Sequence, residues 1–511
     1  MILGRAVLCW WLAPLVAAPR EVVVRLYWLH PPSEARVVTS DGKTHLLRAA
    51  PAHFTGALSL EAPGSTRLAL RGPLEVKPQR GHLLLTLRLP LEEYVAAVLA
   101  GESSVFNSEE ALKAMAVAAR TYAVHHLGRH RSEGFDFCDT THCQDLRLAA
   151  LTDRFRAAAE ATEGELLWYQ GSPAATYYHQ HCGGTTEAAH NVWPDIRAPY
   201  LRQQADTFCL STGRGEWRSE VRKDDLRRAL AIAGPISVEV IRRSSSGRVL
   251  ELRVGGKRLS SASLEHALGS EVLRSNRYEV IDSGDRLIFQ GSGVGHGVGL
   301  CQVGAAQRGA QGHTYRQILD FYYPGTVLGV SAQGFSWVRA AGERVELAST
   351  RPREDQFVAA LADRLLADAE SRAGFALGFR PRVKVYPTVA TFRDATGEPG
   401  WVAASTVGRT VRLQPPPLLR SAGTLESTLR HEMLHLLVES RAHPTLPPWF
   451  REGLVLCLAE PDKPAGRTGI QEPRGQGEMR QAYQEAHSRV RALVDRHGRA
   501  TVIEWLKRGL P

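Results

Sequence analysis

Glycine occupies every second position from 291 to 299, in the run GSGVGHGVGL. In an extended strand, alternate residues face opposite sides, so one side would be bare backbone and the other would carry larger side chains, including His296. A strand this rich in glycine packs poorly, and it usually marks the close approach of a ligand or of another backbone segment. A turn-rich connector is the alternative. We therefore predict an extended segment that is closely approached from one side.

This glycine run does not match the common nucleotide-binding motifs. No Lys-Ser or Lys-Thr pair follows the glycines, as a P-loop requires, and the G-x-G-x-x-G spacing never closes. Downstream, the spacing predicts a helix over Tyr315–Tyr322 that ends at Pro324 and Gly325.

Length and charge limit the class of protein. The chain has 511 residues, enough for two or three domains, and its 43% hydrophobic and 23% charged residues are ordinary for globular proteins. A formal net charge of +10 suits an anionic partner, which can be nucleic acid, membrane or wall polymer. Because the basic residues are scattered and no nucleic-acid motif is present, we expect no nucleic-acid partner.

The N-terminus predicts export. Arg5 precedes an apolar run over residues 6–17, and small residues follow at the end of that run. This pattern is typical of a secretory signal peptide, assigned here to residues 1–18, and an uncleaved anchor is the alternative. We expect the mature chain outside the cytoplasm, in the periplasm or at the cell surface, without stable insertion into a membrane. Disulfides are permitted in that compartment.

The patterning predicts an α+β fold with two domains. The first spans residues 19–330, and its part over 19–80 is rich in short, alternating strands separated by turns. A charged segment over 331–354 is predicted to be a linker. The second domain, over 355–511, is predicted to be mainly helical with a small sheet.

Glu102 is a candidate catalytic residue. A short helix is predicted over residues 91–100, and Gly101 is expected to end it. Glu102 would then lie in the turn before the next helix. On spacing alone, a solvated loop glutamate is the more common interpretation.

Three segments of the sequence favour the catalytic interpretation of Glu102. They are LEEYVAAVLAGES with the following SEEALKAMAVAARTYAV, the segment YYHQHCGGTTE, and the glycine run. Together they resemble the stage II sporulation protein D (SpoIID/LytB-like) family of peptidoglycan lytic transglycosylases, over residues 80–330. The resemblance implies glycan strands as substrate and places the catalytic glutamate at Glu102. It also implies a glycan groove whose residues here are Tyr177, His181, His296 and Gln302. Position 301 departs from it, because the family often has serine where this chain has Cys301.

The chemistry that this resemblance implies needs one acid. A lytic transglycosylase protonates the glycosidic oxygen, and the 6-hydroxyl of the sugar then attacks C1 to leave a 1,6-anhydro end. No second carboxylate has to activate water, unlike in most glycosidases. The acid must keep its proton near neutral pH, so we expect the site of Glu102 to be desolvated.

A second candidate site is the loop CDTTHCQ, over residues 138–144. Cys138, His142 and Cys143 offer two thiols and an imidazole within six residues, a set that suits Zn²⁺. A disulfide between the two cysteines is the alternative. Some members of the family resembled bind zinc at this loop, which favours the metal. Cys182 and Cys209 flank a further loop, and the sequence leaves a disulfide between them open.

The predicted second domain carries the motif HEMLH. His431 and His435 are four apart on a predicted helix, so both can reach one metal ion, and Glu432 would lie beside a metal-bound water. Two unrelated helix histidines are the alternative. The motif with the later WFREG, over residues 380–460, resembles the MA-like gluzincin metallopeptidases. That resemblance implies a second Zn²⁺, held by His431, His435 and Glu452, and Glu432 as general base.

These features together predict a secreted enzyme with a peptidoglycan lytic transglycosylase domain and a zinc-dependent peptidase domain. One alternative is a metallopeptidase that a non-catalytic glycan-binding domain targets to the wall. Another is a wall-binding module without turnover.

Overall fold

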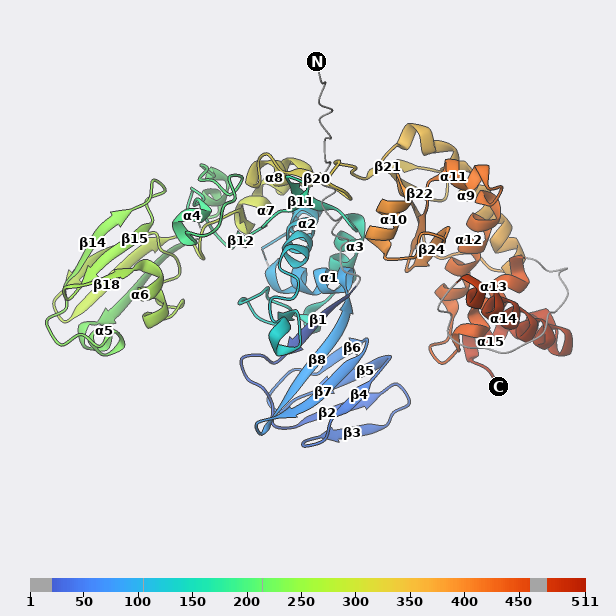
Figure 1. Cartoon of the computed structure of the whole chain (residues 1–511), viewed down its shortest axis with the longest axis horizontal. Helices are drawn as coiled ribbons and strands as arrows, with labels where there is room; N and C mark the ends of the chain where they lie inside the picture. Colours follow the sequence, from blue (N-terminus) through green and yellow to red (C-terminus); the bar gives the residue numbers. More distant parts are fainter. Residues whose placement is uncertain (1–20, 104, 214, 460–475) are drawn as a thin grey trace, which may run out of the picture. The chain divides into compact units, whose positions relative to one another are not determined.

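The computed structural model describes residues 21–103, 105–213, 215–459 and 476–511, so the predicted signal peptide lies outside the described residues. The chain divides into two compact units, Met1–Gly334 and Phe335–Pro511, each described by itself below (Figure 1). Within the ranges just given, none of the helices is long and apolar enough to span a bilayer.

The first unit begins with two antiparallel-rich sheets, in agreement with the predicted β-rich start. Alternate residues of the first strand, Val22, Val24 and Leu26, are buried, as a half-buried strand requires. One sheet has the order β4-β7-β8-β1-β9, with β4 (Ala52–Phe54), β7 (Leu74–Gln79), β8 (His82–Pro90), β1 (Glu21–Leu26) and β9 (Phe137–Cys138). The other has the order β3-β2-β5-β6, with β3 (Thr44–Leu47), β2 (Ala35–Thr39), β5 (Ala57–Glu61) and β6 (Leu68–Arg71).

A buried helix forms the centre of the first unit. Helix α2 (Glu109–His125) contacts four other helices, because its many alanines let neighbouring backbones approach. These are α1 (Leu91–Glu102), α3 (Asp153–Ala161), α7 (Gln302–Ala310) and α8 (Tyr315–Tyr322). The fully buried Arg120 of α2 donates from Nε to Glu92 of α1 over 2.9 Å and from Nη2 to the Ala159 carbonyl of α3 over 2.9 Å.

Two helix predictions have different outcomes. The predicted helix over Tyr315–Tyr322 is confirmed as α8, which begins with a capping box at Thr314. The helix predicted over 91–100 runs on to Glu102, so Gly101 lies inside α1 and does not end it. The prediction that Glu102 lies in a turn was therefore wrong by one residue, since Ser103 is the C-cap.

A smaller lobe with its own apolar core spans residues 216–292, within the stretch of chain between β12 (Tyr178–His179) and β19 (Leu300–Cys301). Trp217, Leu252 and Phe289 lie in this core. Its two sheets have the orders β13-β18-β17 and β14-β15-β16. The strands are β13 (Glu216–Arg222), β18 (Arg286–Ser292), β17 (Tyr278–Ser283), β14 (Val238–Arg243), β15 (Val249–Val254) and β16 (Lys257–Ser260), joined by α5 (Lys223–Leu230) and α6 (Ser261–Leu268).

The glycine run leaves this lobe as a loop, and the predicted extended strand is wrong beyond Ser292. Gly293, Gly295, Gly297 and Gly299 have φ values of 89°, 91°, 83° and 73°, which belong to the left-handed region. The predicted close approach is confirmed. A Cβ on Gly299 would lie 2.0 Å from the Tyr177 carbonyl oxygen, and one on Gly293 would lie 2.9 Å from that of His181.

The second unit places helices against a five-stranded sheet of order β21-β22-β23-β25-β24. Strands β22, β23 and β25 are parallel, and β24 is an antiparallel edge strand. The strands are β21 (Val338–Ala341), β22 (Glu346–Ser349), β23 (Arg382–Val385), β25 (Thr410–Leu413) and β24 (Ala404–Val407). The helices are α9 (Pro352–Ala373), α10 (Val389–Thr396), α11 (Pro416–Ser421), α12 (Leu425–Arg441), α13 (Pro448–Ala459), α14 (Gln476–His497) and α15 (Arg499–Arg508).

The prediction of a linker over 331–354 was wrong. This segment supplies β21 and β22 to the sheet, and α9 begins at Pro352. Val345, Leu347 and Ala348 are buried in the core of the second unit. Strands of four residues among charged residues show too little alternation of apolar and polar side chains to be predicted from the sequence.

Candidate functional site

Glu102 is held by two hydrogen bonds from distant parts of the first unit. Its Oε1 accepts from the backbone N–H of Asp145 over 2.9 Å, and its Oε2 accepts from Gln302 Nε2 over 3.0 Å. Gln302 is the first residue of α7, and Glu102 is the last of α1. Two rigid helices and one loop therefore fix the orientation of this carboxyl group.

Gly101 explains how the loop reaches Glu102. A Cβ at this position would lie 2.1 Å from the Asp145 carbonyl oxygen, so any larger residue would push the loop away. The absence of a side chain lets the backbone around Asp145 lie against the end of α1, where its N–H meets Glu102.

The surroundings raise the pKa of Glu102. Burial disfavours the charged carboxylate and is the largest cause, while the hydrogen bonds from Asp145 and Gln302 oppose it. The Asp145 carboxylate raises the pKa slightly, and Arg147 lowers it. A carboxyl group with a raised pKa can serve as a general acid nearer neutral pH.

Glu102 lies in a cleft of about 600 Å³ with an aromatic wall. The ring centroids of Tyr177 and Trp193 are 4.4 Å apart, and those of Trp193 and His296 are 4.9 Å apart. The predicted residues Tyr177, His296 and Gln302 all line this cleft. So do Tyr122, Arg129 and Trp193, which the sequence reasoning did not assign to the site. A tryptophan within a loop was the one available signal for Trp193.

His296 is neutral near pH 7, because burial lowers its pKa to about 4 and Arg248 adds to this effect. Its Nδ1 accepts from the Val298 N–H over 3.0 Å, so its Nε2 carries the hydrogen. His296 is therefore a neutral ring in the cleft wall, and its ring also makes a hydrogen bond to the Tyr178 backbone.

The prediction that His181 lines the groove is not supported by its position. The ring is buried, and its Nε2 lies 3.2 Å from the Cys209 carbonyl oxygen. Its Nδ1 accepts from the Gly183 N–H over 3.0 Å. His181 thus faces the interior behind the cleft, whereas Tyr177 and His179 line the cleft itself.

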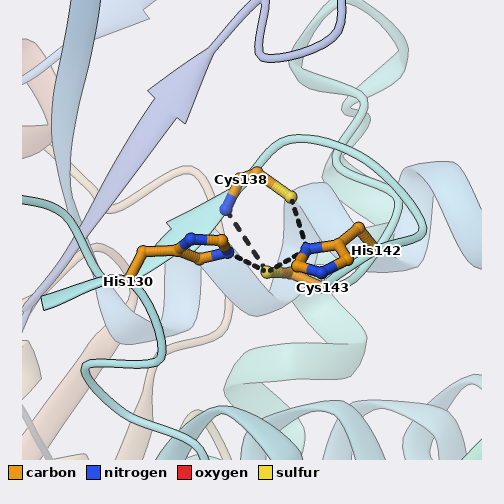
Figure 2. A group of neighbouring side chains, drawn as sticks. All are labelled: His130, Cys138, His142 and Cys143. Carbon is orange, nitrogen blue, oxygen red and sulfur yellow. Dashed lines mark hydrogen bonds between the residues drawn. The ribbon is translucent and has the colours of Figure 1, made fainter. Parts of the chain in front are cut away.

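The loop over residues 138–144 forms a four-residue cluster with His130, which the sequence reasoning did not identify as the fourth member (Figure 2). His130 Nε2 lies 3.4 Å from Cys143 Sγ, and His142 Nδ1 lies 3.7 Å from Cys138 Sγ and 3.8 Å from Cys143 Sγ. Two sulfurs and two imidazole nitrogens within reach of one point are a donor set that fits Zn²⁺.

Neighbouring groups hold these four side chains in place. His130 Nδ1 lies 2.6 Å from Glu133 Oε1, the kind of outer partner that orients a metal-binding imidazole. The Trp28 ring stacks on His142 at 4.9 Å between centroids. Strand β9 pairs with β1 and fixes Cys138 at the edge of the sheet. His142 and Cys143 also line the cleft of Glu102.

In the second unit, the three residues predicted to bind metal come together. His431 and His435 lie on α12, and their Nε2 atoms are 3.0 Å apart. Glu452 on α13 places its Oε1 3.4 Å from His431 Nε2 and its Oε2 3.2 Å from His435 Nε2. Two imidazole nitrogens and a carboxylate that converge in this way fit a cation with one position left open.

Glu432 is buried beside this trio. Its Oε2 accepts from Thr406 Oγ1 over 2.6 Å, and Thr406 belongs to the edge strand β24. Glu432, His431 and His435 line a cleft of about 720 Å³, together with Thr406 and Tyr483. The cleft is thus lined both by residues of the edge strand and by the two histidines of the trio.

Comparison with known proteins finds a family match and several relatives. The family model for SpoIID, stage II sporulation protein, matches residues 79–169. An uncharacterized protein of Brachyspira hyodysenteriae is 31% identical over 264 residues, which are 50% of this chain and 70% of the relative. The stage II sporulation protein D of Bacillus amyloliquefaciens is 27% identical over 294 residues, 54% of this chain and 84% of the relative.

A third relative has a different name. The amidase enhancer of Bacillus subtilis is 28% identical over 285 residues, which are 45% of this chain and 39% of the relative. These matches define a protein of a cell-wall remodelling family. The chain belongs to the SpoIID family, as the sequence resemblance predicted, and this membership implies a part in peptidoglycan remodelling.

Proposed function

We propose that the first unit cleaves the glycan strands of peptidoglycan by lytic transglycosylation, with Glu102 as the general acid. One observation carries this proposal. Among the described residues that line the cleft, Glu102 is the single carboxylate. A hydrolase that uses water needs a second carboxylate across the scissile bond, whereas intramolecular attack does not.

The contacts of Glu102 suit both halves of the reaction. The protonated carboxyl gives its proton to the glycosidic oxygen, and the carboxylate that results is stabilised by the Asp145 N–H and the Gln302 amide. That carboxylate then takes the proton of the 6-hydroxyl as this oxygen bonds to C1. The proton count balances without water, and the acid is restored.

The aromatic wall suits a sugar chain. Tyr177 and Trp193 offer apolar ring surface for the C–H faces of pyranose rings, and the neutral ring of His296 extends this wall. Arg129 adds a positive charge at the same cleft, which suits an anionic wall polymer.

Mass spectrometry of reaction products tests this activity. Purified full-length protein is incubated with intact and with peptide-stripped glycan. We expect 1,6-anhydro ends, and a loss of roughly 10²–10⁴-fold in Glu102→Gln, because this variant cannot donate the proton. The matched control is Glu93→Gln on the same helix, which removes only a surface pair with Arg156.

Other outcomes would replace the proposal. Products with ordinary reducing ends would show a hydrolase. Saturable glycan binding without any cleavage, in an otherwise folded protein, would show a wall-binding module.

We also propose that the second unit is a zinc-dependent peptidase, with His431, His435 and Glu452 as ligands. The observation that favours this is the convergence of their donor atoms next to the buried Glu432. Zn²⁺, when bound there, supplies Lewis-acid activation of water and of the scissile carbonyl. The family match lies within the first unit and does not cover this site. The support for the peptidase is therefore the geometry of these side chains and the sequence resemblance.

The chain's own groups have separate roles in this second proposal. Glu432 accepts a proton from water and passes it to the leaving amine, and Thr406 holds its carboxylate in place. The edge strand β24 can pair with an extended peptide, because its outer edge is not part of a further strand in the described sheet. A peptide bound in this way would lie along the cleft next to Glu432.

Zinc content and cleavage of an unstructured protein substrate test the peptidase in the full chain. Glu432→Gln should keep the wild-type zinc content and lose cleavage, whereas His435→Ala should lose one equivalent of zinc together with cleavage. Glu439→Gln on the same helix removes a pair with Arg451 and a charge that acts on His435 from a distance, so it controls for the loss of a carboxylate near the site. If Glu432→Gln cleaves at the wild-type rate, Glu432 is not the base. If the protein shows only this peptidase activity, and Glu102→Gln leaves every measured activity unchanged, the first unit is a targeting domain.

For the loop cluster, we propose a structural Zn²⁺ held by Cys138, His142, Cys143 and His130. Four protein donors leave no open position, which is typical of structural sites. Such an ion would brace the side of the cleft that His142 and Cys143 line.

A further inference from the structure

Three buried cysteines from separate segments of the first unit meet behind the cleft. Cys182 follows β12, Cys209 lies in the 3₁₀ turn η3 (Thr207–Thr212), and Cys301 is the N-cap of α7. Each is 0% exposed. Cys182 Sγ lies 3.3 Å from Cys209 Sγ, and the Cys182 N–H donates to Cys301 Sγ over 3.3 Å.

A carboxylate completes this group. One oxygen of the buried Asp206 lies 3.7 Å from Cys182 Sγ, and four donor atoms, three sulfurs and this carboxylate, lie within 4.8 Å of one another. Asp206 is held by Tyr322, whose hydroxyl donates over 2.7 Å, and by Arg308 Nη2 over 3.1 Å. Carboxylates that bind metal ions usually have outer hydrogen-bond partners of this kind.

We propose that Cys182, Cys209, Cys301 and Asp206 bind a thiophilic divalent cation of the Zn²⁺ class. Three thiolates and one carboxylate satisfy the four-coordinate preference of Zn²⁺ and leave no position for substrate, so the site is structural. On binding, each thiol releases one proton to solvent and its sulfur donates a pair of electrons to the ion. No oxidant or reductant is needed.

The charges around the cluster suit the bound state. A divalent cation with three thiolates and a carboxylate has a net charge of −2. Two buried guanidinium groups lie next to it, since Arg308 pairs with Asp206 and Arg248 Nη2 donates to the Cys182 carbonyl over 2.8 Å. Among the described residues, Arg248 Nε and Nη1 and Arg308 Nε have no hydrogen-bond partner. Buried cations of this kind are stabilised by nearby negative charge, and Glu187, Cys182 and Cys301 are the groups near Arg248 that can supply it.

The competing structure is a disulfide between Cys182 and Cys209. It would use two of the sulfurs and would leave Cys301 and Asp206 without a role in the cluster. The convergence of a third sulfur from a different segment, together with the carboxylate, favours the metal.

The cluster would position the catalytic machinery. Cys301 immediately precedes Gln302, whose amide donates to Glu102. An ion that joins Cys301 to Cys182 and Cys209 would tie the start of α7 to the segment after β12. The metal assignment does not depend on the proposed transglycosylase activity; only the positioning role does.

Differential alkylation of the wild-type full chain tests the site without any mutation. The protein is treated with a thiol-alkylating reagent before and after a zinc chelator, and cysteine peptides are quantified by mass spectrometry. We expect Cys182, Cys209 and Cys301 to become alkylated together once the chelator has removed the ion. A disulfide-linked peptide pair containing Cys182 and Cys209 would overturn the proposal. Equal alkylation of the three cysteines before and after the chelator would overturn it as well.

Metal analysis of variants gives an independent measurement. Cys301→Ser should contain one equivalent of zinc fewer than wild type, while Cys457→Ser, at a cysteine of the second unit, should keep the wild-type content. Serine is the residue that the resembled family often has at this position, so the fold should tolerate Cys301→Ser, as circular dichroism can verify. A folded Cys301→Ser with unchanged zinc content would contradict the site. If Cys301→Ser loses this zinc but cleaves glycan at the wild-type rate, the metal site is confirmed and its positioning role is excluded.

Discussion

Gln302 Nε2 donates a hydrogen bond to Glu102 Oε2 over 3.0 Å, although 200 residues separate the two in the sequence. The bond joins the end of α1 to the beginning of α7, and the whole lobe with β13 to β18 lies between them in the chain. The acid and its partner therefore come together only when the complete first unit has folded.

Replacing Gln302 should shift the pH dependence of glycan cleavage. Its amide favours the charged carboxylate and so lowers the pKa of Glu102. In Gln302→Leu that pKa should rise further, so the alkaline limb of the pH–rate profile should move to higher pH. The rate near neutral pH should fall about tenfold, because a hydrogen bond to a charged group is lost. Gln311→Leu, at the exposed end of α7, is the control. An unshifted alkaline limb would mean that Gln302 does not act on Glu102.

Glu102→Gln should stabilise the first unit at neutral and alkaline pH. Burial raises the folded-state pKa of Glu102 above its ordinary value of 4.5, so the folded state binds this proton more tightly than the unfolded state. Stability from this group is present below the unfolded pKa and is lost as pH rises through the folded pKa. Glutamine does not titrate, so the gain of Glu102→Gln in Tm should grow from pH 4 upward. A constant difference at every pH would refute the raised pKa.

His130→Ala should lower the zinc content by one equivalent and reduce the Tm, because a structural site would lose its fourth ligand. His125→Ala is the matched control, since His125 lies close in sequence but its Nδ1 faces the Pro173 carbonyl oxygen. Metal analysis and thermal unfolding provide the measurements. Equal zinc content in the two variants would remove His130 from the ligand set.

Trp193→Ala should weaken glycan binding more than it slows the chemistry. The indole contributes ring surface, and its ring contacts are with Tyr177 and His296. We expect KM to rise several-fold, which corresponds to about 1 kcal/mol, with kcat within a factor of two or so. Trp193→Phe should recover most of the affinity. A fall in kcat alone would indicate a role in the reaction itself.

Thr406→Val should reduce proteolysis while zinc stays bound. The hydroxyl of Thr406 holds Glu432, and without it the carboxylate has no fixed direction, so a loss of roughly tenfold is expected. Thr406→Ser keeps the hydroxyl and should restore activity. The cleavage rates of the two variants are compared at equal zinc content. Equal rates would show that the hydrogen bond from Thr406 to Glu432 does not contribute to cleavage.

The local parts of both candidate sites were predictable from the sequence. The HEMLH spacing places two imidazoles on one face of a helix, and the loop over 138–144 brings its three donors together within six residues. Helix α8 was predictable because its capping residue and its proline stop are neighbours of the periodic run. In each case, the determining residues lie within about two turns of one another.

Features that depend on distant contacts were not predictable. His130 joins the loop cluster because the η1 turn (Arg131–Glu133) and Gly134, in a left-handed conformation, reverse the chain. His181 was assigned to the groove by its neighbours, although the chain turns its ring inward against Gly215. Glycine at every second position matched the pattern of a strand, but this spacing does not indicate the positive φ values that the glycines adopt. Tertiary contacts decide each of these cases.

Helix α1 ends at Glu102, and this has an electrostatic consequence. The carbonyl groups of the last turn of a helix give that end a partial negative charge. A carboxylate at this end is repelled by the aligned peptide dipoles, whereas a neutral carboxylic acid is not. The direction of α1 therefore adds to desolvation in keeping the proton on Glu102, and the same glutamate at the first residue of a helix would tend to ionise.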